Sequence, residues 1–365
     1  MSKLAVHFGG GALGRGLVIP LLEQSGYDVV LADVDESLLS DIWGSRGYDL
    51  DITDADEEAR RIHVGVSDAL SSATDQDRLS QYLAKADVVT TAVRRENLHF
   101  VASTLISVPG QSMEGKTVIC AENVEHVGSF FKEALTQAAD DPRKKSVAAS
   151  LVTPDTVVDR ICASDWPNSL VVKTEKYHEL AVDSKVVPET HIALITADNN
   201  IQASFVRKRL LLNTFADASS FMGVPKGLRY LHEAVVDQQI QSQLEPYFSS
   251  FDVLLRRRYG FTDDELGHWK DLYRDRLANP RISRKLSTVA RDLWRKLGLN
   301  ERFVWPLIQL SDMGVDISES VAVLVQLIRA STEENDSEIL ARLTKLWGGE
   351  DCGRRLLDTI SEMLS

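Results

Sequence analysis

The sequence predicts an α/β fold, in which a doubly wound, mostly parallel sheet is followed by an all-α C-terminal domain. Up to about residue 186, short apolar runs alternate with helical patterns, which is typical of parallel strands joined by crossover helices. From residue 187 to residue 365 the apolar periodicity is helical. The chain has 365 residues, more than one hydrophobic core usually fills. We therefore expect two domains, 1–186 and 187–365.

A glycine-rich turn follows the first apolar run. Residues 4–8 lead into Gly9-x-Gly11-x-x-Gly14, and a helical stretch comes next. This order and spacing match the dinucleotide-binding fingerprint of a Rossmann domain. In that fingerprint the first glycine permits a tight turn, the second lets the backbone approach a pyrophosphate, and the third lets the helix pack against the sheet. The cofactor contacts expected in this turn are Gly9, Gly11, Ala12, Leu13 and Gly14.

A carboxylate ends the second apolar run. Residues 28–32 read as a strand, and Asp33 follows Gly14 by 19 residues. At this place a carboxylate accepts hydrogen bonds from the adenosine ribose and repels a 2′-phosphate. An ordinary glycine turn is the alternative, and the combination of strand, glycines, helix and acid disfavours it. The predicted cofactor is NAD rather than NADP.

The run ADVVTTAV, at 86–93, predicts a buried parallel strand. Ligands of doubly wound sheets bind beyond the carboxyl ends of the strands. The residues expected to border the pyrophosphate and nicotinamide are Thr91, Ala92 and Val93. Arg94 and Arg95 follow them, and two readings are equally supported: a phosphate contact, or a solvated start to the next helix.

The remaining elements follow from the same patterns. In the first domain we expect helices at 36–43, 75–85, 97–105 and 127–138, strands at 117–121 and 146–152, a hairpin or loop at 48–61, a basic turn at 142–145 and a β-rich segment at 170–182. In the second domain we expect helices at 199–221, 228–247, 251–259, 262–277, 287–297, 303–313 and from 318 to the end.

Composition excludes several classes of function. The formal net charge of −13 disfavours nucleic acid or an anionic membrane as a partner. The three cysteines, Cys120, Cys162 and Cys352, lie far apart, so neither a disulfide framework nor a cysteine metal site is expected. No two histidines lie at helical ligand spacing, and the pairs His126 with Glu122 and His268 with Asp264 lack a nearby third ligand, so no metal is predicted. Without a signal peptide or a long apolar run, the expected location is the cytoplasm.

Short motifs along the chain resemble, in order, those of the polyol-specific long-chain dehydrogenases. The motifs are FGGGALGRG, ADVD, TTAV, CAENVE, TPDTVVDRI, RKRLLLNT, RRRYGF and LANPRI, and the resemblance runs from residue 4 to at least residue 307. It implies an NAD-dependent, metal-free oxidoreductase. The implied reaction interconverts a sugar alcohol and its ketose, with mannitol 1-phosphate and fructose 6-phosphate as the expected pair.

The resemblance also implies roles for individual residues. The family has a helical pattern of Lys, four residues, Asn, two residues and His, in which the lysine is the general base and the other two bind the reacting oxygen. On this chain the lysine is Lys208 and the asparagine is Asn213, but the histidine position is Ala216. Asp155 falls near the substrate by the same resemblance, and Asn123 near the nicotinamide.

Ala216, at the position of the family's histidine, allows more than one function. On an α-helix of about 100° per residue, Ala216 lies about 80° and Asn213 about 140° around from Lys208, so a histidine at 216 would sit between them. The chain could be a weakened polyol dehydrogenase, a redox enzyme acting on a different sugar or sugar acid, or an NAD-binding protein without catalysis. From the residues alone, Lys208 could also be a surface lysine in a basic triplet.

A substrate phosphate needs a local cationic site in this acidic chain. Two pairs are candidates, Arg281 with Arg284 or Lys285 with Arg291. Exposed helix-end cations are an equally good interpretation of these residues. The oligomeric state is left open.

Overall fold

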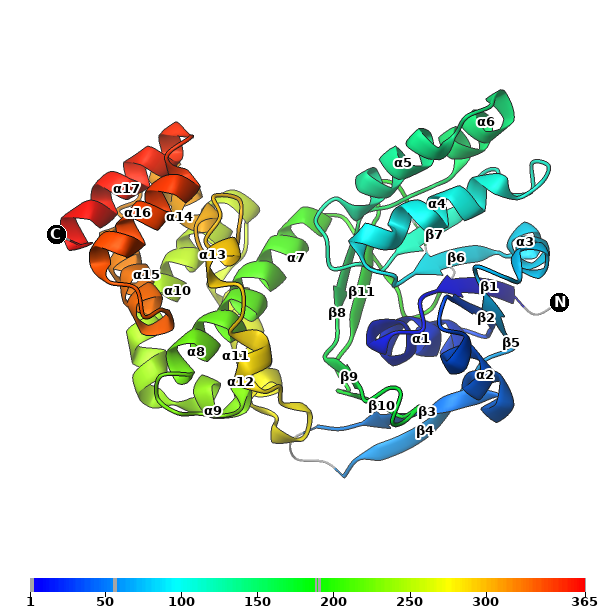
Figure 1. The fold of residues 1–365 in the computed structure, drawn as a ribbon, viewed down its shortest axis with the longest axis horizontal. Helices are drawn as coiled ribbons and strands as arrows, with labels where there is room; N and C mark the ends of the chain where they lie inside the picture. Colours follow the sequence, from blue (N-terminus) through cyan, green and yellow to red (C-terminus); the bar gives the residue numbers. More distant parts are fainter. Residues whose placement is uncertain (1–2, 55–57, 188, 190–191, 365) are drawn as a thin grey trace. The chain divides into compact units, whose positions relative to one another are not determined.

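Figure 1 shows the computed structural model, which describes residues 3–54, 58–187, 189 and 192–364. The chain forms two compact units, Met1–Phe205 and Val206–Ser365. The first contains a five-stranded parallel sheet flanked by helices, and the second is helical. The predicted fold class is therefore confirmed.

The central sheet has the strand order β5-β2-β1-β6-β7, and every neighbouring pair is parallel. Its strands are β1 (Lys3–Phe8), β2 (Tyr27–Asp33), β5 (Asp68–Ser71), β6 (Val88–Thr91) and β7 (Thr117–Cys120). Most of their residues are buried because both faces of the sheet are covered. β2 pairs with one edge of β1, and β6, which comes later in the chain, pairs with its other edge. The strand order therefore reverses direction at β1.

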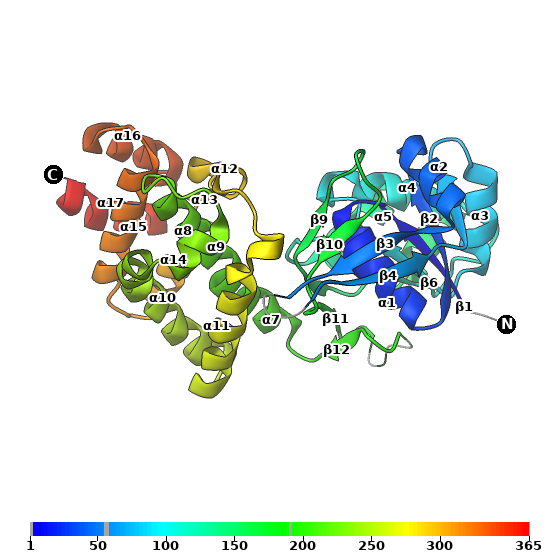
Figure 2. The same ribbon diagram turned by 90° about the horizontal axis from the view of Figure 1, so that it is seen from below.

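Helices cover both faces of this sheet (Figures 1 and 2). One core cluster joins the sheet to α3 (Gln76–Lys85), α4 (Leu98–Ser107), α5 (Val127–Ala138) and α6 (Pro142–Ser150). The other cluster joins it to α1 (Ile19–Gln24) and α2 (Glu36–Ser45). A π-helical segment, η1 (Gly14–Val18), precedes α1, and a 3-10 turn, η2 (Arg95–Asn97), precedes α4.

Two smaller sheets complete the first unit. One has the order β4-β3-β10-β9 and the other β12-β11-β8. Their strands are β3 (Gly47–Ile52), β4 (Arg60–Gly65), β8 (Thr156–Asp159), β9 (Cys162–Ser164), β10 (Val172–Thr174), β11 (Glu179–Asp183) and β12 (Thr196–Asp198). The pair β3 and β4 is antiparallel, so the stretch expected as a hairpin or loop is a hairpin, although residues 55–57 lie outside the described part.

One expected strand is a helix. We expected a basic turn at 142–145 and a strand at 146–152, but α6 spans both from Pro142 to Ser150. The Asp141 side chain accepts a hydrogen bond from the Lys144 N–H at 2.8 Å, and Pro142 occupies the first turn. This aspartate–proline start fixes a helix, and only Val152 reaches the sheet, in an isolated bridge with Thr117.

The second unit is a helical assembly. Its helices are α7 (Ile201–Arg207, which begins in the first unit), the π-helical η3 (Lys208–Thr214), α8 (Phe215–Gly223), α9 (Leu231–Val236), α10 (Gln238–Tyr259), α11 (Asp263–Ala278), η4 (Pro280–Ile282), α12 (Leu286–Val289), α13 (Leu293–Lys296), α14 (Trp305–Asp312), α15 (Ser318–Ser331), α16 (Asp336–Trp347) and α17 (Asp351–Leu364).

The helix boundaries expected around residue 250 are wrong. We expected separate helices at 228–247 and 251–259, but α10 is continuous from 238 to 259 with Pro246 inside it. Tyr247, Phe248 and Phe251 form an aromatic cluster in which the ring centroids of Tyr247 and Phe251 are 4.7 Å apart. This packing outweighs the weak helix propensity of the serines between them.

Candidate functional site

A cavity of about 810 Å³ opens at the carboxyl ends of β1, β2 and β6. It lies where the strand order switches, which is the position at which doubly wound sheets bind ligands. Its volume is within the usual range for small-molecule sites. Five of the expected cofactor residues line it: Gly9, Gly11, Asp33, Ala92 and Val93.

The glycines of the first turn have distinct structural reasons. Gly9 has φ +107°, and a Cβ there would lie 2.5 Å from the carbonyl oxygen of Ala92. A Cβ on Gly14 would collide with the Gly9 carbonyl oxygen and would lie 2.6 Å from Nε2 of His7. A Cβ on Gly11 would meet no atom within 4 Å. Gly11 therefore borders open space, which is what the approach of a phosphate requires.

Asp33 holds the turn while it faces the cavity. One carboxylate oxygen accepts from the Gly10 N–H at 2.5 Å, and the other accepts from the Val34 and Asp35 N–H groups at 2.7 and 3.0 Å. The apolar side of the cavity includes Val34, 74% exposed, and Phe100, 63% exposed. Large exposed apolar side chains beside a carboxylate suit an adenosine group, so the residues present fit a dinucleotide.

Thr91 lies beneath the cavity and is held by a buried acid. The Glu122 carboxylate, 3% exposed, accepts hydrogen bonds from Oγ1 of Thr91 at 2.8 Å and from the Val93 N–H at 2.8 Å. Burial raises the pKa of Glu122, and these hydrogen bonds oppose that shift. Sequence patterns assign Glu122 no role in the site, because its partners lie at the end of β6 and just after it.

The other expected cofactor residues are not on the cavity wall. Ala12, Leu13 and Gly14 lead into the π-helical segment η1, and Asn123 is an exposed residue after β7. These four positions, together with Thr91, therefore stay predictions as direct contacts.

Asp155 anchors a helix start. Its carboxylate accepts from the Gly128 N–H at 2.8 Å and lies 3.2 Å from Nδ1 of His126. His126 has φ 55°, and α5 begins immediately after it. Asp155 thus fixes the loop that follows Asn123, in the first unit.

Lys208 is a buried lysine on a distorted helix. It is 6% exposed and begins the π-helical segment η3, whereas the prediction was an α-helix over 199–221. In the same segment Oγ1 of Thr214 donates to the carbonyl oxygen of Arg209, five residues back, at 2.8 Å. Segments of this kind frequently occur at functional sites. The surface-lysine alternative is therefore excluded by burial.

The two arginines beside Lys208 contact other parts of the second unit. The guanidinium of Arg207 lies 3.6 Å from the ring centroid of Trp269, and its Nε donates to the Tyr273 hydroxyl at 3.0 Å. Arg209 donates to the carbonyl oxygen of Asn300. Both contacts fix the segment that carries Lys208.

The π-helical segment changes the expected arc. A helix with i→i+5 hydrogen bonds holds more residues per turn than an α-helix. Asn213, five residues after Lys208 and half-buried, is therefore closer to the same face than about 140° implies. Ala216, 3% exposed, lies one residue into α8, so the helical-wheel placement of a histidine there does not hold as calculated.

Asp217, which follows Ala216, and His232, in α9, differ in how their polar atoms are satisfied. Asp217 is bound by Nζ of Lys296 at 3.0 Å and by Nη1 of Arg302 at 3.1 Å. Within the described residues, the buried Nδ1 atom of His232 has no hydrogen-bond partner, and its ring stacks on Tyr230.

The described residues contain no group of three or more His, Cys, Asp or Glu side chains placed to hold a metal ion. Nor does any helix among them combine the length and apolar character needed to cross a membrane.

Comparison with known families matches both units. Residues 3–196 match the mannitol dehydrogenase Rossmann domain, and residues 200–342 match the mannitol dehydrogenase C-terminal domain. The mannitol-1-phosphate 5-dehydrogenase of Coccidioides immitis (strain RS) is 28% identical over 365 residues, covering 98% of this chain and 94% of that protein. The enzyme of the same name from Arthrobacter sp. (strain FB24) is 29% identical over 364 residues, covering 93% and 94%.

Solved structures share the fold. D-sorbitol dehydrogenase in substrate-free form has a TM-score of 0.79 at 15% identity, covering 99% of this chain and 92% of that chain. Pseudomonas fluorescens mannitol 2-dehydrogenase, in a ternary complex with NAD and D-mannitol, has a TM-score of 0.78 at 14% identity, covering 100% and 91%. The fingerprint, the cavity and the two family matches agree. The chain belongs to the mannitol dehydrogenase family of polyol-specific long-chain dehydrogenases.

Proposed function

We propose that this polyol dehydrogenase uses NAD to interconvert mannitol 1-phosphate and fructose 6-phosphate, with Lys208 as the general base. The observation that carries the proposal is the burial of Lys208, 6% exposed, on the same distorted helical segment as Asn213. A general base must lie within reach of the hydroxyl proton, and an asparagine amide on the same segment can donate to the same oxygen. The relatives named mannitol-1-phosphate 5-dehydrogenase support the choice of substrate.

The chemistry assigns a task to each group. Oxidation of an alcohol removes a hydride from carbon and a proton from the hydroxyl group. Lys208 accepts the proton on Nζ and becomes an ammonium, and the Asn213 amide donates a hydrogen bond to the reacting oxygen. Bound NAD supplies the hydride acceptor. Gly9, Gly11 and Asp33 are the proposed contacts that hold it.

A cationic surface in the second unit supports a phosphorylated substrate. Residues 229–231 and 284–286 run antiparallel: Tyr230 pairs with Lys285, and the Leu231 N–H donates to the Arg284 carbonyl oxygen at 2.9 Å. The Leu286 N–H donates to the Arg229 carbonyl oxygen at 2.9 Å, so Arg229 lies opposite the residue that follows Lys285. Arg229, Arg284 and Lys285 are all exposed. The pairing therefore favours Arg284 with Lys285 as the phosphate site. It does not favour either pair named from the sequence, Arg281 with Arg284 or Lys285 with Arg291.

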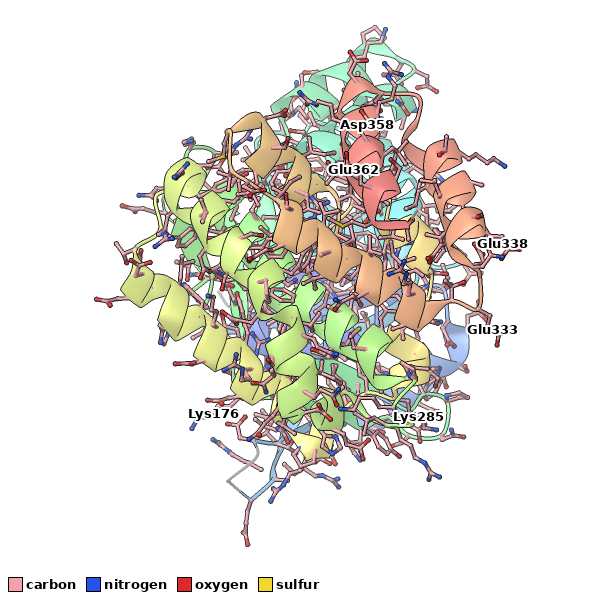
Figure 3. The ribbon with its side chains drawn as sticks, turned by 90° about the vertical axis from the view of Figure 1, so that its left-hand side faces the viewer. Lys176, Lys285, Glu333, Glu338, Asp358 and Glu362 are labelled. Carbon is pink, nitrogen blue, oxygen red and sulfur yellow. The ribbon has the colours of Figure 1, made fainter. Side chains whose placement is uncertain are left out.

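One group of acidic side chains of this unit lies apart from Lys285. Figure 3 shows Lys285 apart from the labelled carboxylates over α16, α17 and the loop before α16, which are Glu333, Glu338, Asp358 and Glu362. Glu233 is a carboxylate at the paired segments, where Oε2 accepts from the Arg229 and Tyr230 N–H groups at 2.8 Å. The cations of Arg229, Arg284 and Lys285 outnumber it, so an anionic group would be attracted to the paired segments.

The test is turnover followed by nicotinamide absorbance on a panel of polyols, polyol phosphates and sugar acids. We expect oxidation of mannitol 1-phosphate with NAD and little with mannitol. Turnover of a sugar acid alone would favour the altered-substrate alternative that Ala216 suggests. Cofactor binding without turnover on any compound would favour the non-catalytic alternative.

A further inference from the structure

Arg94 has a backbone conformation that side chains avoid. Its φ is 69° and its ψ is 154°, a region that is essentially restricted to glycine. The other described non-glycine residues with positive φ are Arg46, His126 and Asp292, and all three have φ of 55–57° and ψ of 30–40°. That is the left-handed helical region, which is tolerated. Arg94 is the strained exception among them.

The surrounding structure fixes the strained residue from the preceding peptide. The Val93 N–H donates to the buried Glu122 carboxylate at 2.8 Å, and the Val93 carbonyl oxygen accepts from Nδ2 of Asn97 at 2.8 Å. The Asn97 N–H in turn donates to the Arg94 carbonyl oxygen at 3.1 Å. Strain of this kind persists only where neighbouring contacts over-determine it, and it is concentrated at functional sites.

Arg94 borders the cofactor cavity, and its guanidinium has no carboxylate partner among the described residues. Arg94 lines the cavity with Gly9 and Gly11. No carboxylate of the described residues pairs with its guanidinium, in a chain of net charge −13. The next residue differs, because the guanidinium of Arg95 lies 4.5 Å from the ring centroid of Phe130. The two arginines that the sequence could not separate are thereby distinguished.

We propose that Arg94 binds the pyrophosphate of the dinucleotide, and that the strained backbone is retained because it holds this cation at the cavity. Charge-assisted hydrogen bonds from a guanidinium to phosphate oxygens are strong and directional. Arg94 is thus a cofactor-binding residue in addition to the glycine turn. The inference rests on the cofactor cavity of the proposed function.

The test separates charge from strain. Arg94→Gly removes both, Arg94→Lys keeps a cation, and Arg95→Ala is the matched control that removes a neighbouring cation. Calorimetry with ADP and with adenosine reports the pyrophosphate contribution directly. For Arg94→Gly we expect ADP to bind at least tenfold more weakly, adenosine to bind within twofold of the parent, and the urea midpoint of unfolding to rise. We expect Arg94→Lys to recover part of the ADP affinity and Arg95→Ala to match the parent.

The contrary outcomes are distinct. If the parent binds ADP and NADH and Arg94→Gly binds ADP equally well, the inference is wrong and the proposed cofactor use stands. If the parent prefers NADPH and Arg94→Gly loses that preference, Arg94 binds a ribose 2′-phosphate, which overturns the inference. If the parent binds neither ADP nor NADH, the proposed function fails and the inference fails with it.

Discussion

Nδ1 of His7 lies 2.7 Å from Oγ1 of Thr90, its register partner across β1 and β6. Nε2 of the same ring lies 3.0 Å from the carbonyl oxygen of Gly9. The fully buried imidazole therefore joins the central strand pair to the first glycine of the cofactor turn. Burial lowers the pKa of His7 from 6.5 to about 4.

This pKa predicts a pH dependence of stability. Between pH 6.5 and pH 4 the unfolded chain binds a proton at this histidine and the folded chain does not, so stability falls as the pH falls. From pH 7 to pH 5 the His7 contribution is a loss of about 2 kcal/mol. Urea unfolding of the parent and of His7→Gln at both pH values measures it, because only the parent has the titrating ring. Equal losses in the two proteins would show that His7 does not titrate this way.

Lys208→Ala should abolish most turnover and leave NADH affinity nearly unchanged. A positioned general base contributes about 10²-fold to 10⁴-fold in rate, and the cofactor cavity belongs to the first unit whereas Lys208 belongs to the second. Steady-state kinetics and NADH titration measure the two properties. Lys226→Ala is the control, because Lys226 is an exposed lysine paired with Asp237. A Lys208→Ala protein that keeps most of its rate would refute the assignment of the base.

Cofactor choice should follow Asp33. Its carboxylate lies on the cavity wall, so NADH should bind more tightly than NADPH, whose 2′-phosphate it repels. Asp33→Asn removes the charge and can keep an acceptor for the Gly10 N–H, so it should narrow the difference. Calorimetry with both nucleotides on both proteins decides this, and equal affinities in the parent would contradict it.

Ala216→His should raise polyol turnover by roughly tenfold or more if the chain is a weakened polyol dehydrogenase, because a donor to the reacting oxygen is restored. Ala216 is 3% exposed, so folding must be checked by circular dichroism and NADH binding. Ala218→His, at a fully buried position of the same helix, is the control for a histidine in α8. A folded Ala216→His protein with no gain on any polyol would favour the altered-substrate or non-catalytic alternative.

Asp217→Asn should destabilise the second unit by about 3–5 kcal/mol, because it leaves the Lys296 and Arg302 charges without their buried counterion. Asp336→Asn removes a carboxylate from an exposed pair with Arg329, and a much smaller loss of stability is expected there because solvent screens the pair. Urea unfolding of both variants gives the comparison. Similar small losses would mean that solvent screens the Asp217 pair.

Apolar periodicity in the sequence predicts the elements that depend on neighbouring residues alone. The strand end at Asp33 is predicted because a short apolar run stops there, whereas the strand expected over 86–93 spans only Val88–Thr91. The fold class follows from the order of the apolar runs. The segment 146–152 was misread as a strand because its apolar residues outweighed the Asp141–Pro142 helix start. Glu122 was missed because it bonds to a residue 31 positions earlier, and such a contact leaves no periodic signal.

The π-helical segment Lys208–Thr214 also constrains how this chain can vary in length. A surface loop usually accepts an added or lost residue, whereas one residue lost from the packed α-helix α8 would rotate everything after it by about 100°. A turn with i→i+5 hydrogen bonds holds one more residue than a turn with i→i+4 bonds. Loss of one residue from the π-helical segment can therefore be absorbed by conversion to α-helix, which keeps the buried positions Ala218 and Phe221 against their neighbours. A one-residue deletion should be tolerated better in this segment than in α8.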